Sequence, residues 1–213
     1  MAMGHSHFRR PSIWIGLAVL WLGGTAAGLG ALAAYANRPG APAHAPANWP
    51  SSSRLTLDGQ HPTLVMLVHP KCDCTRASLA ELAELMARAP HRSHAYVVFL
   101  KPAGVADDWE HTDLWEAVKR IPDVTAVVDD EGREAERFGG ETSGQALLYD
   151  RRGRLLFAGG TTVARGHEGD SAGLAAILAL LNEGQATQTS APVFGCPLFD
   201  ANHQESERKK TAL

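Results

Sequence analysis

Two cysteines, Cys72 and Cys74, are separated by a single residue in the segment HPKCDCT, residues 69–75. A cysteine thiolate is both a nucleophile for thiol–disulfide exchange and a soft ligand for metal ions. Buried structural cysteines usually lie inside apolar segments, whereas this pair has Pro, Lys, Asp and Thr as neighbours. We therefore predict a chemical role for both. A single Cys-x-Cys pair is less specific than the paired Cys-x-x-Cys motifs of zinc sites.

Two predicted elements position this pair. Residues 63–68 (TLVMLV) form an uninterrupted apolar run with β-branched residues, which predicts a buried strand. Apolar residues then recur at helical spacing and predict a helix over about residues 74–89 that ends before Pro90. The cysteines therefore lie where a buried strand ends and a helix begins.

The start of a helix favours the thiolate form of cysteine. A helix N-terminus carries partial positive charge and free N–H groups, which stabilise a nearby thiolate. Lys71 and Arg76 act in the same direction, while Asp73 opposes them or serves as the N-cap.

The amino-terminal part of the chain predicts a membrane anchor. Residues 13–36 contain no charged residue and are long enough to cross a bilayer as a helix. Arg9 and Arg10 precede this span and only Arg38 follows it closely, so we expect residues 1–12 to stay in the cytoplasm. We expect a single-pass protein of the bacterial inner membrane whose domain faces the periplasm. Since residues 34–36 (AYA) resemble a cleavage site, a removed signal peptide is the alternative.

The remainder divides into three predicted parts. Residues 37–54 are rich in Pro, Ala and Ser and predict a flexible linker. Residues 55–184 form the folded domain, and residues 185–213 a C-terminal tail that carries Cys196. The net charge of −3 over 213 residues gives no indication of nucleic-acid binding, so we expect no nucleic-acid partner.

The order of elements predicts an α/β domain. After the first strand and helix, the pattern predicts a strand at 95–100, a helix from Trp109 to Val118, a strand at 124–128, a short helix at 134–138, a hairpin at 146–157 and a helix at 171–181 capped by Asp170 or Ser171. In the first half of the domain strands alternate with helices, which favours parallel strands. The hairpin in the second half adds antiparallel strands. We predict a central mixed sheet flanked by helices.

This order, with cysteines between the first strand and its helix, resembles the thioredoxin fold. Residues 124–160 resemble the TlpA-like membrane-anchored branch in their strand, Asp-x-x-Gly turn, short helix and hairpin, and the resemblance spans about residues 64–181. The segments HPKCDCTRASLAEL, TSGQALLYD and ARGHEGD together resemble RedB-like proteins. The resemblance implies a thioredoxin-like domain behind a transmembrane helix, with redox activity on exported protein thiols or disulfides.

Two departures from the family pattern matter. The family usually has Cys-x-x-Cys, where this chain has Cys72-x-Cys74. The family's cis-proline would fall at Gly144. Because a cis bond without proline costs several kcal/mol, we predict a trans peptide between Ser143 and Gly144.

Three chemistries compete for the cysteine pair. In thiol–disulfide exchange, one thiolate attacks a partner disulfide and the other resolves the mixed disulfide, which would make the chain a thiol–disulfide oxidoreductase without a cofactor. The family's attacking cysteine is the one nearer the strand, which implies Cys72. In the alternative, Cys72, Cys74 and His69 bind copper, by analogy with Sco-type copper chaperones. A one-cysteine peroxidase is the third option, although the peroxiredoxin motif is missing.

Two further regions are candidate parts of the site. The loop over residues 159–170 should lie near the cysteine end of the sheet, where Arg165 or His167 would tune a cysteine pKa or act as an acid–base group; the alternative is a flexible surface loop. Cys196 lies in an apolar segment, PVFGCPLF. We predict that this segment folds back over the cysteine end, and that Cys196 pairs transiently with Cys72 or Cys74 or completes a three-sulfur metal site. The alternative is tail packing with a free thiol.

Overall fold

The computed structural model of the chain describes residues 11–199. The predictions for residues 1–10 and for the end of the tail lie outside these residues. The chain divides into two compact units, the first ending at Asn37 and the second beginning at Arg38.

The first unit contains a single helix, α1 (Pro11–Ala36). Its residues from Ile13 to Ala36 have a mean hydropathy of 1.7. A helix of 24 residues is long enough to cross the hydrocarbon core of a bilayer. The chain therefore carries an apolar helix near its amino terminus that could span a membrane.

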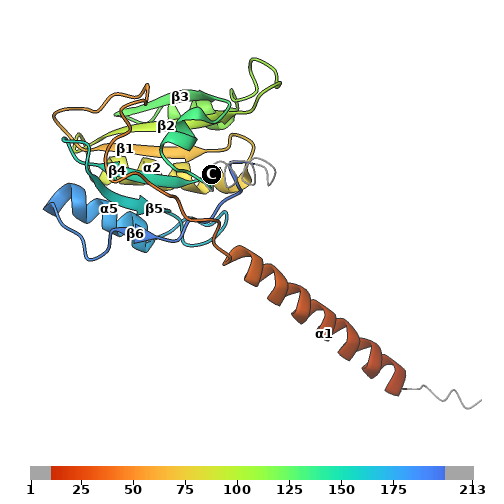
Figure 1. Cartoon of the computed structure of the whole chain (residues 1–213). Coiled ribbons are helices and arrows are strands. Elements are labelled where there is room, and N and C mark those ends of the chain that lie inside the picture. The colour runs from red at the N-terminus through yellow and green to blue at the C-terminus, as the bar shows by residue number, and fades with distance from the viewer. Residues whose placement is uncertain (1–10, 200–213) are drawn as a thin grey trace, which may run out of the picture. The chain divides into compact units, whose positions relative to one another are not determined.

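The second unit is built on a six-stranded mixed sheet with the order β3-β2-β1-β4-β5-β6 (Figure 1). The strands are β1 (Thr63–Val68), β2 (His94–Lys101), β3 (Val124–Asp130), β4 (Gln145–Tyr149), β5 (Leu155–Gly159) and β6 (Ser190–Ala191). Strands β1, β2 and β3 are parallel, whereas β4 is antiparallel to both β1 and β5. The predicted mixed sheet and hairpin are confirmed.

The helices of this unit are α2 (Asp73–Arg88), α3 (Asp113–Val118), α4 (Arg133–Arg137) and α5 (Ala172–Glu183). Helix α2 matches its prediction to within the usual uncertainty of helix ends, although its N-cap is Cys72 and not Asp73. Helix α3 is shorter than predicted, since Trp109 lies in the loop before it. Ser171 caps α5 as predicted, because its hydroxyl accepts the Leu174 N–H.

The central strand β1 is buried on both faces and separates two cores. Leu64, Met66 and Val68 pack with helices α2 and α5 on one face. On the other face, Val65 and Leu67 pack with Ala135 of α4. Leu55, before β1, and Leu198, after β6, belong to the same core. An uninterrupted apolar run is the pattern expected of such a doubly covered strand.

The segment before β1 is part of the domain. The Trp49 ring lies edge-on to Phe138 and Tyr149, with centroids 5.0 and 5.3 Å apart, and the Trp49 N–H donates to the Gly153 carbonyl at 2.7 Å. The Tyr149 hydroxyl donates to the Pro46 carbonyl at 3.1 Å. The prediction of a flexible linker over residues 37–54 is therefore wrong for these residues, because extended Pro-rich backbone is hydrogen-bonded and anchored by a tryptophan.

The segment after α5 also belongs to the domain. Strand β6 pairs in parallel with β5, and Val193 and Leu198 are each only 4% exposed. The predicted division into a domain ending at residue 184 and a separate tail is corrected accordingly: residues 190–199 pack on the domain.

Candidate functional site

The site begins where β1 ends. After Val68 the chain turns, with the Cys72 N–H donating to the His69 carbonyl at 3.2 Å, and α2 starts when the Thr75 N–H donates to the Cys72 carbonyl at 3.0 Å. This turn places Cys72 at the N-cap, where its side chain is 4% exposed. Cys74 lies in the first turn of α2 and is half-buried. Both cysteines thus occupy the helix start that the sequence predicts.

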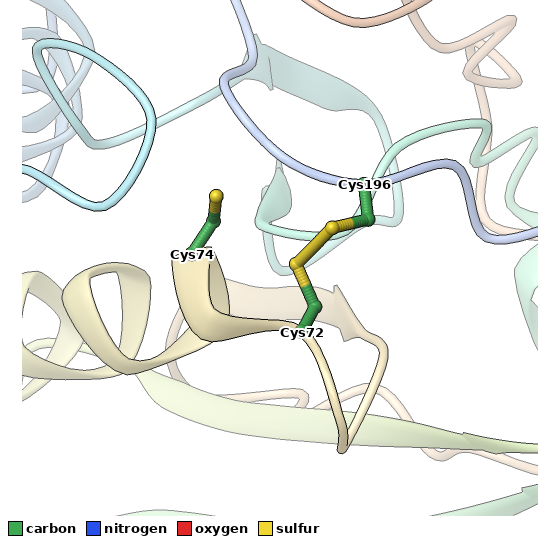
Figure 2. A group of neighbouring side chains, drawn as sticks. All are labelled: Cys72, Cys74 and Cys196. Carbon is green, nitrogen blue, oxygen red and sulfur yellow. A yellow bond between two sulfur atoms is a disulfide. The ribbon is translucent and has the colours of Figure 1, made fainter. Parts of the chain in front are cut away.

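The third cysteine reaches the same place. Cys72 and Cys196, 124 residues apart in sequence, form a disulfide with a Cα–Cα distance of 6.3 Å, within the usual range for such bonds. Cys74 is free, and the three sulfur atoms all lie within 4.8 Å of one another (Figure 2). The predicted fold-back of the segment around Cys196 is confirmed. A bond between Cys72 and Cys74 is not formed, because Cys196 supplies the partner sulfur.

Cys196 is carried by residues 192–199, which we call the C-terminal arm. The arm runs antiparallel to the loop before β4: the Ser143 N–H donates to the Cys196 carbonyl at 2.8 Å, and the Leu198 N–H donates to the Glu141 carbonyl at 2.9 Å. Thr142 and Pro197 form an antiparallel bridge between these bonds. Backbone pairing therefore fixes the register that sets Cys196 opposite Cys72.

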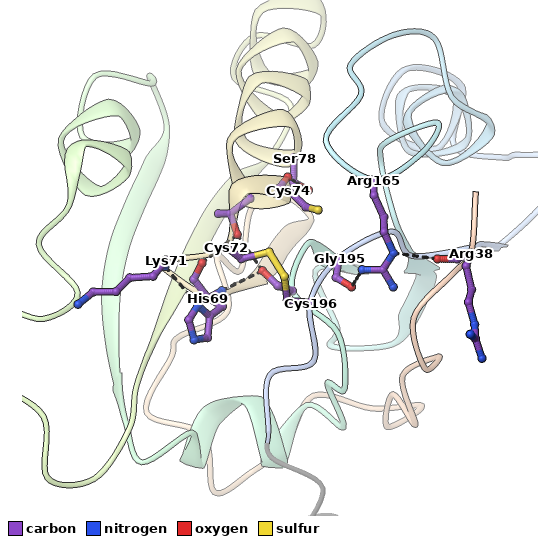
Figure 3. Close-up of a disulfide and its surroundings, with 11 residues drawn as sticks. Arg38, His69, Lys71, Cys72, Cys74, Ser78, Arg165, Gly195 and Cys196 are labelled. Atoms are coloured by element: carbon purple, nitrogen blue, oxygen red, sulfur yellow. Dashed lines mark hydrogen bonds between the residues drawn. A yellow bond between two sulfur atoms is a disulfide. The ribbon is translucent and has the colours of Figure 1, made fainter. Parts of the chain in front are cut away.

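The predicted loop residues Arg165 and His167 contact backbone. The Arg165 guanidinium donates to the Gly195 carbonyl next to Cys196, and to the Arg38 carbonyl at 3.1 Å (Figure 3). His167 is exposed, and its Nδ1 lies 2.7 Å from the Arg165 carbonyl. None of these hydrogen bonds joins a sulfur. Arg165 holds the C-terminal arm, a role that the sequence did not indicate. A part for Arg165 or His167 in the cysteine chemistry stays a prediction.

His69 is not part of the sulfur cluster. Its Nδ1 accepts the Lys71 N–H at 3.2 Å, and its ring lies edge-on to Trp109 with centroids 5.3 Å apart. The Lys71 ammonium lies 4.8 Å from the centroid of the same Trp109 ring. Within residues 11–199, the grouped metal-binding side chains consist of the three cysteines alone. The third candidate ligand is therefore Cys196, and the predicted ligand set with His69 is not formed.

A hydroxyl network joins the helix start to the loop before β4. The Ser143 hydroxyl accepts the His69 N–H at 2.9 Å and lies 2.9 Å from the Thr75 hydroxyl, which donates to the His69 carbonyl. Ser143 and Thr75 are both buried. Next to them, the Gly144 N–H donates to the Leu67 carbonyl, and no cis peptide occurs within residues 11–199. The expected trans peptide before Gly144 is confirmed.

Glu81 is a buried carboxylic acid on the helix that carries Cys74. It lies seven residues after Cys74, on the same helix face, and is 2% exposed. Burial raises the pKa of Glu81, and the Gly169 N–H, which donates to its Oε1 at 2.6 Å, opposes this shift only in part. Sequence reasoning missed Glu81, Ser143 and Trp109, since each lies in a pattern that also fits an ordinary helix or loop.

Comparison of the sequence with models of known protein families finds no match, and comparison with curated proteins finds none either. Solved structures do match. An uncharacterized conserved protein from Geobacillus kaustophilus is 16% identical, with 78% of this chain and 94% of that chain covered and a TM-score of 0.56. A hypothetical protein from Sinorhizobium meliloti is 21% identical, with 77% and 96% covered and a TM-score of 0.52. The exposed lipoprotein thioredoxin of Streptococcus pneumoniae is 18% identical, with 58% and 84% covered and a TM-score of 0.43.

Topology and site together define the fold. A parallel β1-α2-β2 unit, an antiparallel β4-β5 hairpin beside β1 and a final helix α5 make up the core, and the cysteines lie between β1 and α2. The chain therefore has a thioredoxin-like fold, preceded by an apolar helix. The narrower resemblance to RedB-like proteins stays a prediction.

Proposed function

We propose that this chain is a membrane-anchored thiol–disulfide exchange protein that acts outside the cytoplasm. One observation carries the proposal: Cys72, at the start of α2 in a thioredoxin-like fold, is bonded to Cys196 with the free Cys74 sulfur within 4.8 Å. The Cys72–Cys196 pair supplies both the attacking and the resolving sulfur that exchange requires.

The exchange proceeds in two balanced steps. In the reduced chain, the Cys72 thiolate attacks one sulfur of a partner disulfide, whose S–S bond breaks and whose second sulfur leaves as a thiolate. The Cys196 thiolate then attacks the Cys72 sulfur of the mixed disulfide, forms the Cys72–Cys196 bond and releases the partner as a dithiol. Two electrons pass to the partner, and a dithiol that reduces the Cys72–Cys196 bond reverses this electron flow. The N-terminus of α2 favours the Cys72 thiolate both as attacker and as leaving group.

The membrane arrangement follows from charge and redox compartment. Arg9 and Arg10 before the apolar helix favour an amino terminus in the cytoplasm, which exports the domain. Disulfides persist in such exported compartments. We place the domain in the periplasm at the bacterial inner membrane, with thiols or disulfides of exported proteins as partners. The reaction needs no cofactor.

Cysteine variants of the full chain in detergent micelles test this function. The measurement is reduction of an oxidised dithiol peptide by the pre-reduced protein, with mass spectrometry of acid-quenched, alkylated samples. We expect Cys72→Ser to abolish exchange and Cys196→Ser to accumulate a mixed disulfide through Cys72. Cys74→Ser is the matched control, since it leaves the Cys72–Cys196 pair intact. Full exchange by Cys72→Ser would refute the proposal, and trapping through Cys74 alone would reassign the attacking residue.

Copper binding is a second candidate because three sulfur atoms converge. Three thiolates form a soft site suited to Cu(I), once the disulfide is reduced. Titration of the reduced full chain with Cu(I) against a chromogenic chelator measures the affinity. We expect Cys196→Ser to weaken binding, whereas His69→Ala should leave it unchanged because His69 lies outside the cluster. Equal affinities for wild type and Cys196→Ser would exclude the three-sulfur site.

A further inference from the structure

The C-terminal arm lies on the loop before β4 as an added peptide strand would. Its backbone exchanges hydrogen bonds with Glu141 and Ser143 on either side of the Thr142–Pro197 bridge, in the antiparallel sense. Extended peptides bind exposed backbone edges in this way: backbone bonds provide affinity, and pockets for alternate side chains provide specificity. Residues 141–143 therefore form an edge that accepts an extended polypeptide.

The position before the cysteine accepts only glycine. A Cβ on Gly195 would lie 1.9 Å from the Ser143 carbonyl oxygen and 3.3 Å from Cγ2 of Thr142. Both atoms belong to the edge itself, and the oxygen is backbone, so it cannot rotate away. Any polypeptide in this register therefore needs glycine directly before its cysteine.

The second position after the cysteine fills an apolar pocket. Leu198 is 4% exposed and packs in the core formed by β1, β4 and α4. Gly140 borders this pocket: a Cβ on it would lie at an ordinary contact distance of 3.5 Å from Cδ1 of Leu198 but would collide with Leu67. A large apolar side chain at this position anchors the polypeptide. Between Gly195 and Leu198, the Cys196 sulfur is bonded to Cys72.

We propose that the C-terminal arm is a built-in occupant of a polypeptide-binding edge, and that this edge also receives an extended partner polypeptide with the pattern Gly-Cys-x-apolar. This proposal rests on the proposed exchange function. It adds the class of partner, and it adds that the arm regulates the partner's access to Cys72. The edge has one set of backbone groups, the Ser143 N–H and the Glu141 carbonyl, and the arm uses both. The arm and the partner therefore compete.

The arm leaves only after its covalent bond to Cys72 is reduced, for which a protein dithiol supplies two electrons. Cys196 is more exposed than Cys72, so the first dithiol sulfur attacks Cys196. The Cys72–Cys196 bond breaks, and the electron pair leaves on Cys72 at the start of α2. The second dithiol sulfur then displaces Cys196 as a thiolate and closes the dithiol's own disulfide. In the oxidised chain the arm covers the edge formed by residues 141–143. In the reduced chain the arm can leave this edge, and a partner polypeptide can bind there.

The test compares two peptides on two forms of the protein. Both forms are the membrane-anchored chain in micelles with Cys74→Ser and Cys196→Ser, so that Cys72 is the remaining cysteine. One keeps the arm, and the other ends at residue 191. The peptides are PVFGCPLF, the sequence of the arm, and PVFACPLF, each with its cysteine as a mixed disulfide with thionitrobenzoate. The absorbance of released thionitrobenzoate measures attack by Cys72.

Without the arm, we expect the glycine peptide to react at least about tenfold faster than the alanine peptide, a difference of about 1.4 kcal/mol. With the arm in place, both peptides should react slowly. A small aromatic disulfide is the control, because its rate should change much less than that of the glycine peptide on removal of the arm. If the shortened chain fails to fold, Leu198→Asp in the full-length background replaces it.

Three outcomes would overturn the inference. The first is equal rates for the two peptides on the form without the arm, and the second is a glycine peptide that reacts as fast with the arm present as without it. The third is a Cys72–Cys196 disulfide that joins two copies of the wild-type chain on a non-reducing gel. The exchange function would survive each of them. Absence of any reaction at Cys72, with peptides and small disulfide alike, would instead refute the exchange function.

Discussion

At the scale of single residues, one hydroxyl joins the cysteine turn to the arm-binding edge. Ser143 accepts the His69 N–H and contacts Thr75 through its side chain, while its backbone N–H binds the Cys196 carbonyl. Its side chain and its backbone thus contact the two segments that carry the bonded cysteines. This explains how sulfur atoms from distant parts of the chain keep a common position.

Ser143→Ala should lower the free energy of unfolding of the domain by about 1–3 kcal/mol, because the substitution removes the Ser143 hydroxyl that accepts the partly buried His69 N–H. Denaturant unfolding of the full chain in micelles, followed by circular dichroism, measures the change. Ser51→Ala is the matched control, since Ser51 is exposed. An effect no larger than that of the control would mean that the network does not stabilise the turn.

Glu81 should make stability depend on pH. Burial raises its folded-state pKa above the unfolded value of about 4.3. The stability from this group is therefore fully present below about pH 4.3, and it is lost as the pH rises through the raised folded-state pKa. Glu81→Gln removes this loss, so the stability of the variant relative to wild type should increase between pH 4 and pH 8.

Unfolding curves across that pH range measure this difference. The exposed Glu84→Gln on the same helix controls for the deletion of one negative charge. A difference between Glu81→Gln and wild type that stays constant, or that decreases with pH, would contradict a raised pKa.

At the scale of elements, local sequence patterns were sufficient to predict the helices and strands that pack against elements adjacent to them in sequence. The apolar run before the cysteines, the spacing of the leucines in α2 and the turn residues of the hairpin predicted β1, α2, β4 and β5 close to their observed bounds. They also placed Cys72 and Cys74 at a helix start, since that position depends only on adjacent elements.

The same patterns failed where residues far apart in sequence pack together. The Pro-rich segment before β1 has no apolar periodicity, yet Trp49 anchors it against Phe138 and Tyr149. The choice of Cys196 over Cys74 as the partner of Cys72 depends on backbone pairing across more than 50 residues, and periodicity carries no signal of such pairing.

The packing of this segment predicts its resistance to protease. Trp49→Ala should free residues 38–54, so that trypsin cleaves after Arg54 much faster than in wild type. The stability loss should be below the roughly 3–5 kcal/mol of a fully buried tryptophan, because Trp49 is half-buried. Electrophoresis of timed digests of the full chain measures cleavage.

Trp109→Ala is the matched control, as an equally bulky deletion on the His69 side of the domain. Rapid cleavage of wild type at Arg54 would show that the segment is not packed in solution. Equal acceleration by both substitutions would show that Trp49 has no special role in holding it.

At the scale of the whole molecule, the disulfide links redox state to the stability of the domain. It closes a loop with a sequence separation of 124 residues, and on chain-entropy grounds a loop of this order stabilises the folded state by about 4–5 kcal/mol. The arm also has buried anchors on each side of Cys196, at Val193 and Leu198. Reduction should therefore loosen the arm without unfolding the sheet, which is the behaviour that reversible exchange requires.

The location of the domain decides whether this chemistry can operate, and Cys74 reports that location. Among the three cysteines, Cys74 is the free thiol and is half-buried, so a reagent can reach it. In intact bacterial cells with a permeabilised outer membrane, a membrane-impermeant maleimide should label the wild-type chain without detergent, because the proposed topology exports the domain. Cys74→Ser should lose this label, which confirms that Cys72 and Cys196 are paired. Labelling that occurs only after the inner membrane is dissolved would place the domain in the cytoplasm, where thiols are kept reduced and the oxidised, covered state would not accumulate.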